Sequence, residues 1–376
     1  MKSTIAQERF TALDIFRGMT ICFMIIVNTS GNSATTFWPL LHADWHGFTP
    51  TDLVFPSFLF AVGNALSFVS KKWETMRQQD VLLKITKRTL LIFGVGYLMY
   101  WFPFFRLDND LHVIAAAVTH TRIMGVLQRI ALCYGIVALM VYYLGTKKTI
   151  WLGVIGLFVY WVLLMIFGVA GAEYTKTGNA VLRLDTWLFG VNHLYGGEGF
   201  PFDPEGVLST IPALFNVIGG YVVGNYLQQK DKSYEALTKI LLGGALLLFA
   251  AYCWNDFFPI NKKLWTSSYS LLTVGLDCVI LSAIIYLTDF VGVKKGANFF
   301  IVAGKNPLTI YLLSELGVTV MFMIHIGNQS LFTWLYQNIF RHAGDYAGAF
   351  LFAVWWMLSC WLVGYLLDKK KIYIRL

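Results

Sequence analysis

The side chains that could do chemistry gather in one stretch, LLHADWHGFTPTDLVFPSFLF at 40–60, which leads into a long apolar run. His42 and His46 are four residues apart, and Asp52 follows them. Histidine can accept and return a proton near neutral pH, and a carboxylate beside it can fix its tautomer. Asn28, at the end of the preceding apolar run, could donate a hydrogen bond to an oxyanion. These residue types predict general acid–base chemistry at this loop.

The same loop also fits a purely structural role. Thr49 or Thr51 followed by Asp52 is typical of a helix N-terminus, where a side-chain oxygen accepts hydrogen bonds from the first backbone N–H groups. Asp44 and His46 would then be accessory groups on a solvated loop. The residues alone leave the catalytic and the capping interpretations open.

Three further segments are rich in polar groups, at 119–129, 192–212 and 261–270. Arg122 and Arg129 are seven residues apart, which places them on one face of a helix. Carboxylates, amides and an aromatic face together offer the donors and acceptors that a sugar needs. The candidate substrate-binding residues are Arg122, Gln128, Arg129, His193, Asp203, Glu205, Asn261, Lys262 and Trp265.

The elements that must position these residues are apolar helices. The chain has 376 residues, of which 57% are hydrophobic and 13% charged, whereas soluble domains are about a quarter charged. Continuous apolar runs of about 20 residues indicate membrane-spanning helices, and a β-barrel would show alternating segments of about 10 residues instead. We therefore predict an all-α integral membrane protein that forms a single domain over 1–376. Its ten expected spans are 12–29, 51–70, 82–104, 122–144, 149–171, 206–227, 236–253, 267–288, 303–325 and 347–368.

The ninth span is the least regular, because Gly304 and Pro307 indicate a broken or late-starting helix. No cleavable signal peptide is expected, since the start is polar and leads directly into the first span. The five cysteines are expected to be small buried hydrophobes, and their spacing predicts no metal site.

Lysine and arginine predict the orientation of these spans. The two termini and the turns on their side carry 19 basic residues, and the opposite loops carry seven. Because basic residues are enriched on the cytoplasmic side, both termini are predicted to be cytoplasmic. The formal net charge of +8 reflects this bias, and nucleic-acid binding is not expected. All seven histidines are then expected on the extracytoplasmic side: His42, His46, His112, His120, His193, His325 and His342.

Charged residues inside apolar runs are costly and are therefore candidates for function. Asp14 and Arg17 are one helical turn apart and could pair with each other. Glu315 lies in the middle of its span and is the predicted partner of Arg129, and Asp277 is also in mid-span.

A basic group at the predicted cytoplasmic ends could hold the phosphates of a nucleotide. It consists of Arg17, Arg88 and Lys305, and we include Asn306 with it. The same cations are also explained by the positive-inside bias, with Lys305 extending to the interface.

Several of these segments together carry a family resemblance. In chain order they are LDIFRGMTICFMIIVNTSG, HADWHGFTPTDLVFPSFLFAVG, GVLQRIAL, HLYGGEGFPFDPEGVLSTI, NKKLWTSSY and GKNPLTIYLLSE. The sequence resembles the heparan-α-glucosaminide N-acetyltransferase family over nearly the whole chain. The H-A-x-W-x-G-x-T-x-x-D-L-V-F-P block and the D-P-E-G block are the specific ones.

The resemblance implies transmembrane acetylation. Acetyl-CoA is supplied from the cytoplasm, and the acetyl group reaches the amino group of a glucosamine on the other side. The active-site histidine of the family falls on His42, with Asn28 and Asp52 at two further family positions. Arg17, Arg88, Lys305 and Asn306 are then candidates for binding CoA. We expect direct transfer with His42 as the base, and acetyl carried on His42 is the competing mechanism.

The sequence also departs from the lysosomal members of the family. It begins almost at the first span, and it has His46 where they have asparagine. It therefore resembles the bacterial branch, which implies an inner-membrane location and leaves the acceptor sugar and a homodimer open. Two other functions remain as alternatives: a secondary transporter of a sugar or anion, built on Arg129, Asp277 and Glu315, and an O-acyltransferase acting on cell-envelope polysaccharide.

Overall fold

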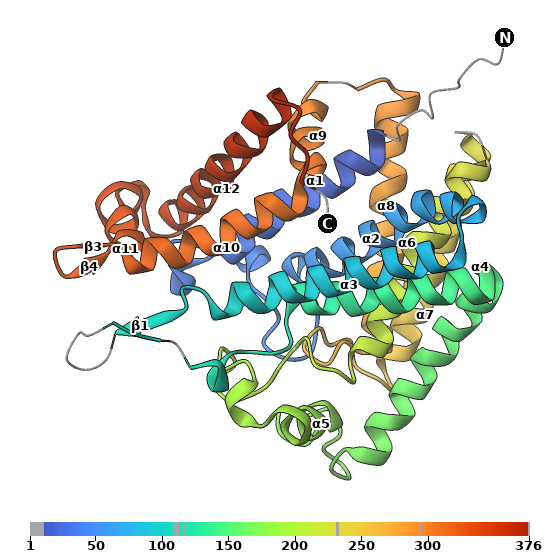
Figure 1. Cartoon of the computed structure of the whole chain (residues 1–376), viewed down its shortest axis with the longest axis horizontal. Coiled ribbons are helices and arrows are strands. Elements are labelled where there is room, and N and C mark those ends of the chain that lie inside the picture. Colours follow the sequence, from blue (N-terminus) through green and yellow to red (C-terminus); the bar gives the residue numbers. More distant parts are fainter. Residues whose placement is uncertain (1–10, 108–112, 116, 231–232, 294, 375–376) are drawn as a thin grey trace.

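The computed structural model describes residues 11–107, 113–115, 117–230, 233–293 and 295–374, and these are mostly helical (Figure 1). The helices are α1 Thr11–Asn28, α2 Val54–Ser70, α3 Gln78–Trp101, α4 Val126–Phe167, α5 Ala180–Phe189, α6 Thr210–Gln229, α7 Tyr234–Asn255, α8 Ser267–Ile285, α9 Ala297–Lys305, α10 Pro307–Met323, α11 Leu331–Leu335 and α12 Asp345–Lys369. Two small antiparallel pairs complete the fold, β1 Phe105–Leu107 with β2 Val113–Ala115 and β3 His325–Ile326 with β4 Gln329–Ser330. His112 lies outside the described residues.

The structure confirms an all-α protein of the multi-pass membrane type. In the described part of the chain, six helices are long and apolar enough to cross a membrane, and a seventh crossing follows if α9 and α10 form one broken span. Helices α3 and α6 have 24 and 20 residues but are not among these six. The count of ten spans therefore stays a prediction.

Helix α4 covers two of the predicted spans. Its 42 residues would rise about 63 Å, twice the thickness of the hydrocarbon core. Gly145 interrupts it with φ of 70° and ψ of 173°, a conformation that glycine adopts without the steric cost that a Cβ brings. The two arms of α4 diverge at this bend (Figure 1). Lys147 and Lys148 follow directly, which is where two crossings would return to the basic side.

The predicted irregularity near Pro307 is confirmed as a break. Helix α9 ends at Lys305, helix α10 begins at Pro307, and their axes differ by 81°. Asn306 between them has φ of −128° and ψ of 49°. Proline favours the first turn of a new helix because its missing N–H needs no partner there.

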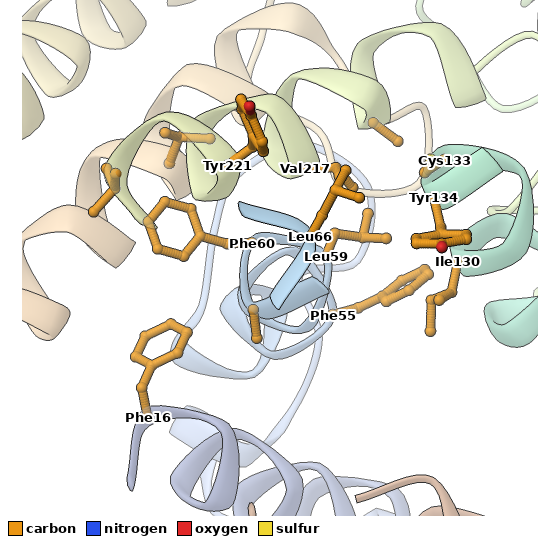
Figure 2. Packing of buried hydrophobic residues seen from close by; sticks show 14 of the residues in the cluster. Phe16, Phe55, Leu59, Phe60, Leu66, Ile130, Cys133, Tyr134, Val217 and Tyr221 are labelled. Atoms are coloured by element: carbon orange, nitrogen blue, oxygen red, sulfur yellow. The ribbon is translucent and has the colours of Figure 1, made fainter. Parts of the chain in front are cut away.

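Helix α2 lies at the centre of the core, with side chains of α1, α4 and α6 around it (Figure 2). It packs closely on α6, because a Cβ on Gly63 would lie 1.9 Å from the Val217 carbonyl oxygen and one on Gly220 would lie 1.9 Å from that of Phe60. Small residues of this kind let helix backbones approach in a membrane. Since α2 follows directly after Asp52, this packing fixes the position of the polar loop at its start.

Four of the five cysteines, Cys22, Cys133, Cys278 and Cys360, are buried as expected. Cys253 is exposed on α7, so the expectation of burial is wrong there. Only 28% of the apolar stretch of α7 is buried within the protein, and the remainder is available to face lipid.

Candidate functional site

The polar loops that were predicted on one side pack against one another. The loop before α2 is joined to the loop before α8 by a hydrogen bond from the Gly47 N–H to the Ile260 carbonyl, at 2.8 Å. The segment before α4 is joined to the segment after α5 by one from the Ile123 N–H to the His193 carbonyl, at 3.3 Å. These main-chain bonds set the spacing between the side chains of the candidate site.

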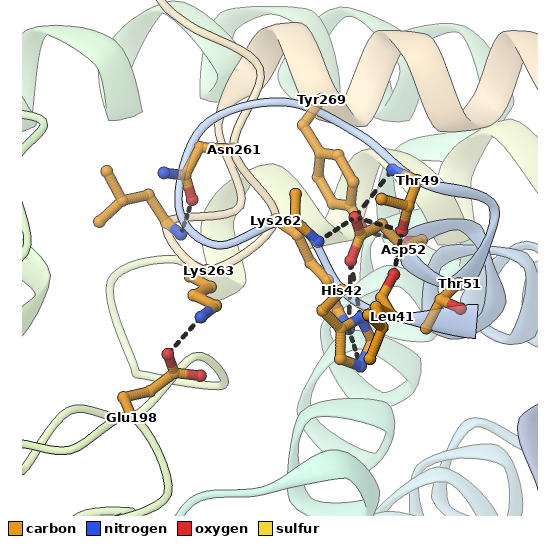
Figure 3. Close-up of polar contacts among 12 residues, drawn as sticks. Leu41, His42, Thr49, Thr51, Asp52, Glu198, Asn261, Lys262, Lys263 and Tyr269 are labelled. Carbon is orange, nitrogen blue, oxygen red and sulfur yellow. Dashed lines mark hydrogen bonds and ion pairs between the residues drawn. The ribbon is translucent and has the colours of Figure 1, made fainter. Parts of the chain in front are cut away.

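Asp52 is the buried anchor of the site, and its side chain is 1% exposed. Its Oδ1 accepts a hydrogen bond from His42 Nδ1 at 2.7 Å, while Oδ2 accepts from the backbone N–H groups of Ala43 and Thr49 at 3.2 and 3.0 Å. An ionised carboxylate can only accept, so the ring proton lies on Nδ1 and Nε2 is left as the basic nitrogen. The His42 side chain remains 43% exposed, which gives a substrate access to it (Figure 3).

The structure confirms the capping interpretation of this loop, and the same aspartate also contacts His42. The turn Pro50–Leu53 begins after Thr49, and the Asp52 N–H donates to the Thr49 carbonyl at 2.9 Å. Asp52 Oδ2 therefore closes the turn while Oδ1 holds His42. Tyr269 of α8 donates to the Asp52 carbonyl at 2.6 Å and fixes the residue from the core side.

Lys262 lies directly against His42, a relationship that the sequence did not predict. Its Nζ is 3.0 Å from His42 Nδ1, 3.2 Å from Nε2 and 3.8 Å from Asp52 Oδ1. Because Nδ1 donates its proton to Asp52, Nε2 is the ring nitrogen able to accept from Lys262, and Nζ lies beside the ring within reach of it. The neighbouring Lys263 points elsewhere and pairs with Glu198 (Figure 3).

The loop that carries Lys262 is held rigidly. The Asn261 Oδ1 accepts a hydrogen bond from the Leu264 N–H at 2.8 Å, and the Thr266 N–H donates to the Asn261 carbonyl at 3.0 Å. Asn261 is fully buried, and its amide also lies 3.3 Å from His46 Nδ1. Asn261 thus shapes the turn and connects it to the histidine loop.

The surroundings lower the pKa of the His42 ring. Partial removal from water is the main cause, and the Lys262 ammonium acts in the same direction, whereas the hydrogen bond and charge of Asp52 oppose it. A lowered pKa keeps more of the imidazole in its basic form at neutral pH. Burial also lowers the pKa of Lys262, which the carboxylates of Asp52 and Glu205 counteract.

The predicted substrate-binding residues Arg122, Asp203 and Glu205 form one cluster. Arg122 donates to both oxygens of Asp203, at 3.0 and 2.6 Å, and also to Glu205. Its guanidinium lies 4.9 Å from the ring centre of Tyr100 and 4.6 Å from that of Tyr195. Burial lowers the pKa of Arg122, but Tyr100 and the carboxylates of Glu205 and Asp203 outweigh it and hold this pKa above its ordinary value. Tyr195 belongs to the polar segment 192–212, whereas Tyr100 was not predicted, since a tyrosine in an apolar run gives no signal of its own.

Arg129, Gln128 and Trp265 lie behind this cluster and are fully buried. Arg129 donates to the Gly206 carbonyl at 2.8 Å and to Ser209, and its guanidinium lies 4.9 Å from the Trp265 ring centre. Trp265 therefore presents its ring to Arg129 within the core. These residues support the start of α6 and the turn that carries Lys262.

The predicted pairing of Glu315 with Arg129 is wrong. Glu315 instead accepts a hydrogen bond from Asn28 at 3.2 Å, which joins α10 to the end of α1. Asp277 accepts a hydrogen bond from Ser57. His193 Nδ1 lies 2.7 Å from the Thr121 carbonyl and connects the loops rather than facing His42.

Three residues of the predicted basic group line a cavity of about 550 Å³. Arg17, Arg88 and Lys305 all line it together with Asp14, and its walls include Phe58, Ala61, Val62, Ala65 and Val69 of α2. Arg17 pairs with Asp14 at 3.5 Å as predicted, and Lys305 binds Asp368 at 2.7 Å. The buried Arg88 Nε has no hydrogen-bond partner among the described residues. Asn306 instead binds the backbone of Ile372 and Ile374.

Asp185 of α5 is a buried titratable group that the sequence did not indicate as part of a site. It is 1% exposed and accepts a hydrogen bond from the Val207 N–H at 3.0 Å. Burial raises its pKa to about 7. A single aspartate in an amphipathic segment carries no signal that would distinguish it from a surface residue.

Comparison with known proteins supports the predicted resemblance. The chain is 26% identical to heparan-alpha-glucosaminide N-acetyltransferase of Mus musculus in an alignment 425 positions long. This alignment covers 99% of this chain and 61% of that protein. It is 25% identical to the Homo sapiens protein of the same name in an alignment 429 positions long, which covers 98% of this chain and 60% of that protein. The chain thus spans about three fifths of the length of these curated relatives. No family model matches the sequence.

Proposed function

We propose that this protein is a membrane acetyltransferase that moves an acetyl group from acetyl-CoA to the amino group of a glucosamine-type sugar. The observation that carries this proposal is the pair formed by Asp52 and His42, in which a buried carboxylate orients an accessible imidazole. The similarity to two N-acetyltransferases over nearly the whole chain supports the same reaction class.

His42 acts as the general base in this mechanism. Its Nε2 takes a proton from the acceptor amine as the nitrogen attacks the thioester carbonyl, and Asp52 stabilises the imidazolium that forms. The C–S bond then breaks, and His42 returns the proton to the leaving thiolate. The lowered pKa of His42 suits this role, because the ring must be unprotonated before the amine arrives.

The cavity beneath the site suits the donor. Arg17, Arg88 and Lys305 in its lining match the phosphates of CoA in charge. From Phe58 to Val69 its wall follows about 16 Å of α2, mostly apolar, which suits a long and thin pantetheine arm. Phe58 is less than two helical turns from Asp52, so the thioester end would point toward His42.

The loops around Arg122 are proposed to receive the acceptor sugar. Asp203 and Glu205 hold the guanidinium in place, Tyr195 lies against it, and Lys262 lies beside His42. Asn28 remains the proposed donor to the oxyanion, with Glu315 positioning its amide.

The proposed topology has ten spans, with both termini in the cytoplasm and His42 on the extracytoplasmic side. The gathering of the polar loops at one end of α2 and of Arg17, Arg88 and Lys305 toward the other supports it. An inner-membrane location in a bacterium stays a prediction.

Acetyl transfer by the purified protein tests this function. Wild type in nanodiscs should acetylate glucosamine from labelled acetyl-CoA and leave N-acetylglucosamine unmodified, while His42→Ala should lose activity by about 10²–10⁴-fold. Labelling of N-acetylglucosamine would favour a hydroxyl acceptor. Glucosamine uptake into liposomes without acetyl-CoA, abolished by Glu315→Gln and retained by His42→Ala, would favour a transporter.

A further inference from the structure

Lys262 places a primary amine beside His42, within reach of the proposed base. General-base catalysis needs the attacking nitrogen within hydrogen-bond reach of the base. The Lys262 Nζ is 3.2 Å from His42 Nε2, the only ring nitrogen that Asp52 leaves basic. It is a primary amine, as is the amino group of the proposed sugar acceptor.

The position of Lys262 is set by the fold of its loop. The backbone is fixed by the turn from Asn261 to Thr266 and by the buried Leu264 and Trp265 on its C-terminal side. The bond between Gly47 and Ile260 ties this turn to the histidine loop. The Lys262 side chain is 16% exposed, so it lies at the site and not in open solvent.

The environment also makes Lys262 a better nucleophile than a surface lysine. Burial lowers its pKa, which increases the fraction of neutral amine, and a lysine removed from water is a recurring nucleophile in covalent catalysis. The groups that face it are His42, Asp52, Glu205, Glu198 and Lys263. Glu198 is engaged by Lys263 and Glu205 by Arg122.

We propose that Lys262 is an internal acetyl acceptor, and that the protein acetylates it when no amino sugar is bound. This inference rests on the proposed acetyl transfer. The neutral Nζ attacks the thioester carbonyl carbon, an amide N–C bond forms and the C–S bond breaks. His42 takes the proton from nitrogen and gives it to the departing thiolate, so the products are N-acetyl-Lys262 and free CoA.

Acetylation of Lys262 would also inhibit the acetylation of sugar. An acetylated Lys262 carries no charge and fills the space beside His42 Nε2. The sugar amine competes with Lys262 for the same base, so a bound acceptor protects the lysine. Acetylation of Lys262 is therefore a self-limiting reaction that occurs when donor is present without acceptor.

The test is acetylation of the full-length protein in nanodiscs by isotope-labelled acetyl-CoA without a sugar. Chymotryptic peptides spanning Asn261 to Trp265 are analysed by tandem mass spectrometry over time. We expect label on Lys262 to appear about 100-fold faster than on the adjacent Lys263, because general-base help is worth 10²–10⁴-fold. The amide should survive hydroxylamine, whereas acetyl on a histidine ring would be lost.

Matched variants make the result specific. Lys263→Arg should leave the labelling of Lys262 intact, and both His42→Ala and His42→Gln should reduce it to the level seen at Lys263. Glucosamine added with the donor should slow it. Equal labelling of the two lysines in wild type, or labelling that persists in both His42 variants, would overturn the inference.

Glucosamine acetylation measured on the same samples separates this inference from the proposed function. Acetylated sugar without preferential label on Lys262 would overturn the internal acceptor and leave the transferase standing. Neither product in wild type would overturn both.

Discussion

Asp52 holds His42 with one carboxylate oxygen and closes a helical turn with the other. Oδ1 lies 2.7 Å from His42 Nδ1, and Oδ2 accepts from the backbone N–H of Thr49 at 3.0 Å. Asp52, the third residue of the turn Pro50–Leu53 that leads into α2, is thereby also the group that orients His42. Substitutions at Asp52 must be judged on both stability and rate.

Asp52→Asn should lower kcat by about 10²–10⁴-fold, because the amide no longer selects the tautomer with Nε2 unprotonated. Thr49→Ala serves as the control, since it removes a side-chain contact to Asp52 and one to the Leu41 carbonyl but leaves the pair with His42. It should cost about 1 kcal/mol of stability and change kcat far less. Steady-state kinetics with a thermal-unfolding scan of each variant gives both quantities. Equal losses of kcat in the two variants would contradict the orienting role of Asp52.

The pH dependence of kcat/KM should report the lowered pKa of His42. Protonation of the ring abolishes the base, so activity should fall as the pH falls, with the acid limb centred below 6.5. Lys262→Met removes a nearby positive charge that lowers the pKa of His42. The pKa of His42 should therefore rise, and the acid limb should move to higher pH.

Lys263→Met is the matched control for this shift. Lys263 acts on His42 in the same direction but is the weakest of the named contributions, so the limb should move less than in Lys262→Met. Profiles of kcat/KM measured between about pH 5 and 8 give the midpoint pH of the acid limb for each variant. This midpoint is compared between the variants, and the maximum activity is not. A limb that moves to lower pH in Lys262→Met would contradict the electrostatic account.

The sequence was sufficient for the fold class and for the contact between His42 and Asp52. Apolar periodicity and length predict the helices, and the types and spacing of His42 and Asp52 predict their interaction. The sequence also predicted that Arg17, Arg88 and Lys305 form one group, and all three line the same cavity. These features depend on local composition or on a general rule of membrane orientation.

Contacts between distant loops could not be predicted in the same way. Lys262 is 220 residues from His42, and nothing in NKKLW distinguishes Lys262 from Lys263 until the turn is folded. The erroneous pairing of Glu315 with Arg129 has the same origin, because both lie within predicted spans and the sequence does not show which helices adjoin. The number of crossings also depends on tertiary context, as the 42-residue α4 with its bend at Gly145 illustrates.

Arg88→Gln should raise the KM for acetyl-CoA by about 10–100-fold, as expected for one lost charge-assisted contact of about 1.5–3 kcal/mol. The KM for glucosamine should stay the same, because none of the residues proposed to bind the sugar lines this cavity. Lys87→Gln changes the exposed neighbour on the same helix and should alter neither constant. Ala65→Phe, which places a ring in the cavity, should reproduce the donor-specific effect. A rise in the glucosamine KM alone would contradict this assignment of the cavity.

Arg122→Gln should destabilise the protein by about 3–5 kcal/mol, because it leaves Asp203 and Glu205 buried without their cation. Arg122→Lys should recover only part of this loss, since an ammonium cannot bridge a carboxylate with two parallel N–H groups. The melting temperature of each protein in detergent measures the effect. Arg183→Gln, at an exposed arginine of α5, is the control. An Arg122→Gln protein as stable as this control would contradict the structural role of the cluster.

We propose that one site transfers acetyl from a donor at one membrane face to an acceptor at the other. An assay with the two substrates on opposite sides of a membrane tests this most directly. Proteoliposomes of defined orientation would carry glucosamine inside and labelled acetyl-CoA outside, with the protein termini facing outward. The account predicts labelled N-acetylglucosamine inside the vesicles and unlabelled sugar with His42→Ala. Product that forms only when both substrates are on the same face, or that forms equally with His42→Ala, would contradict it.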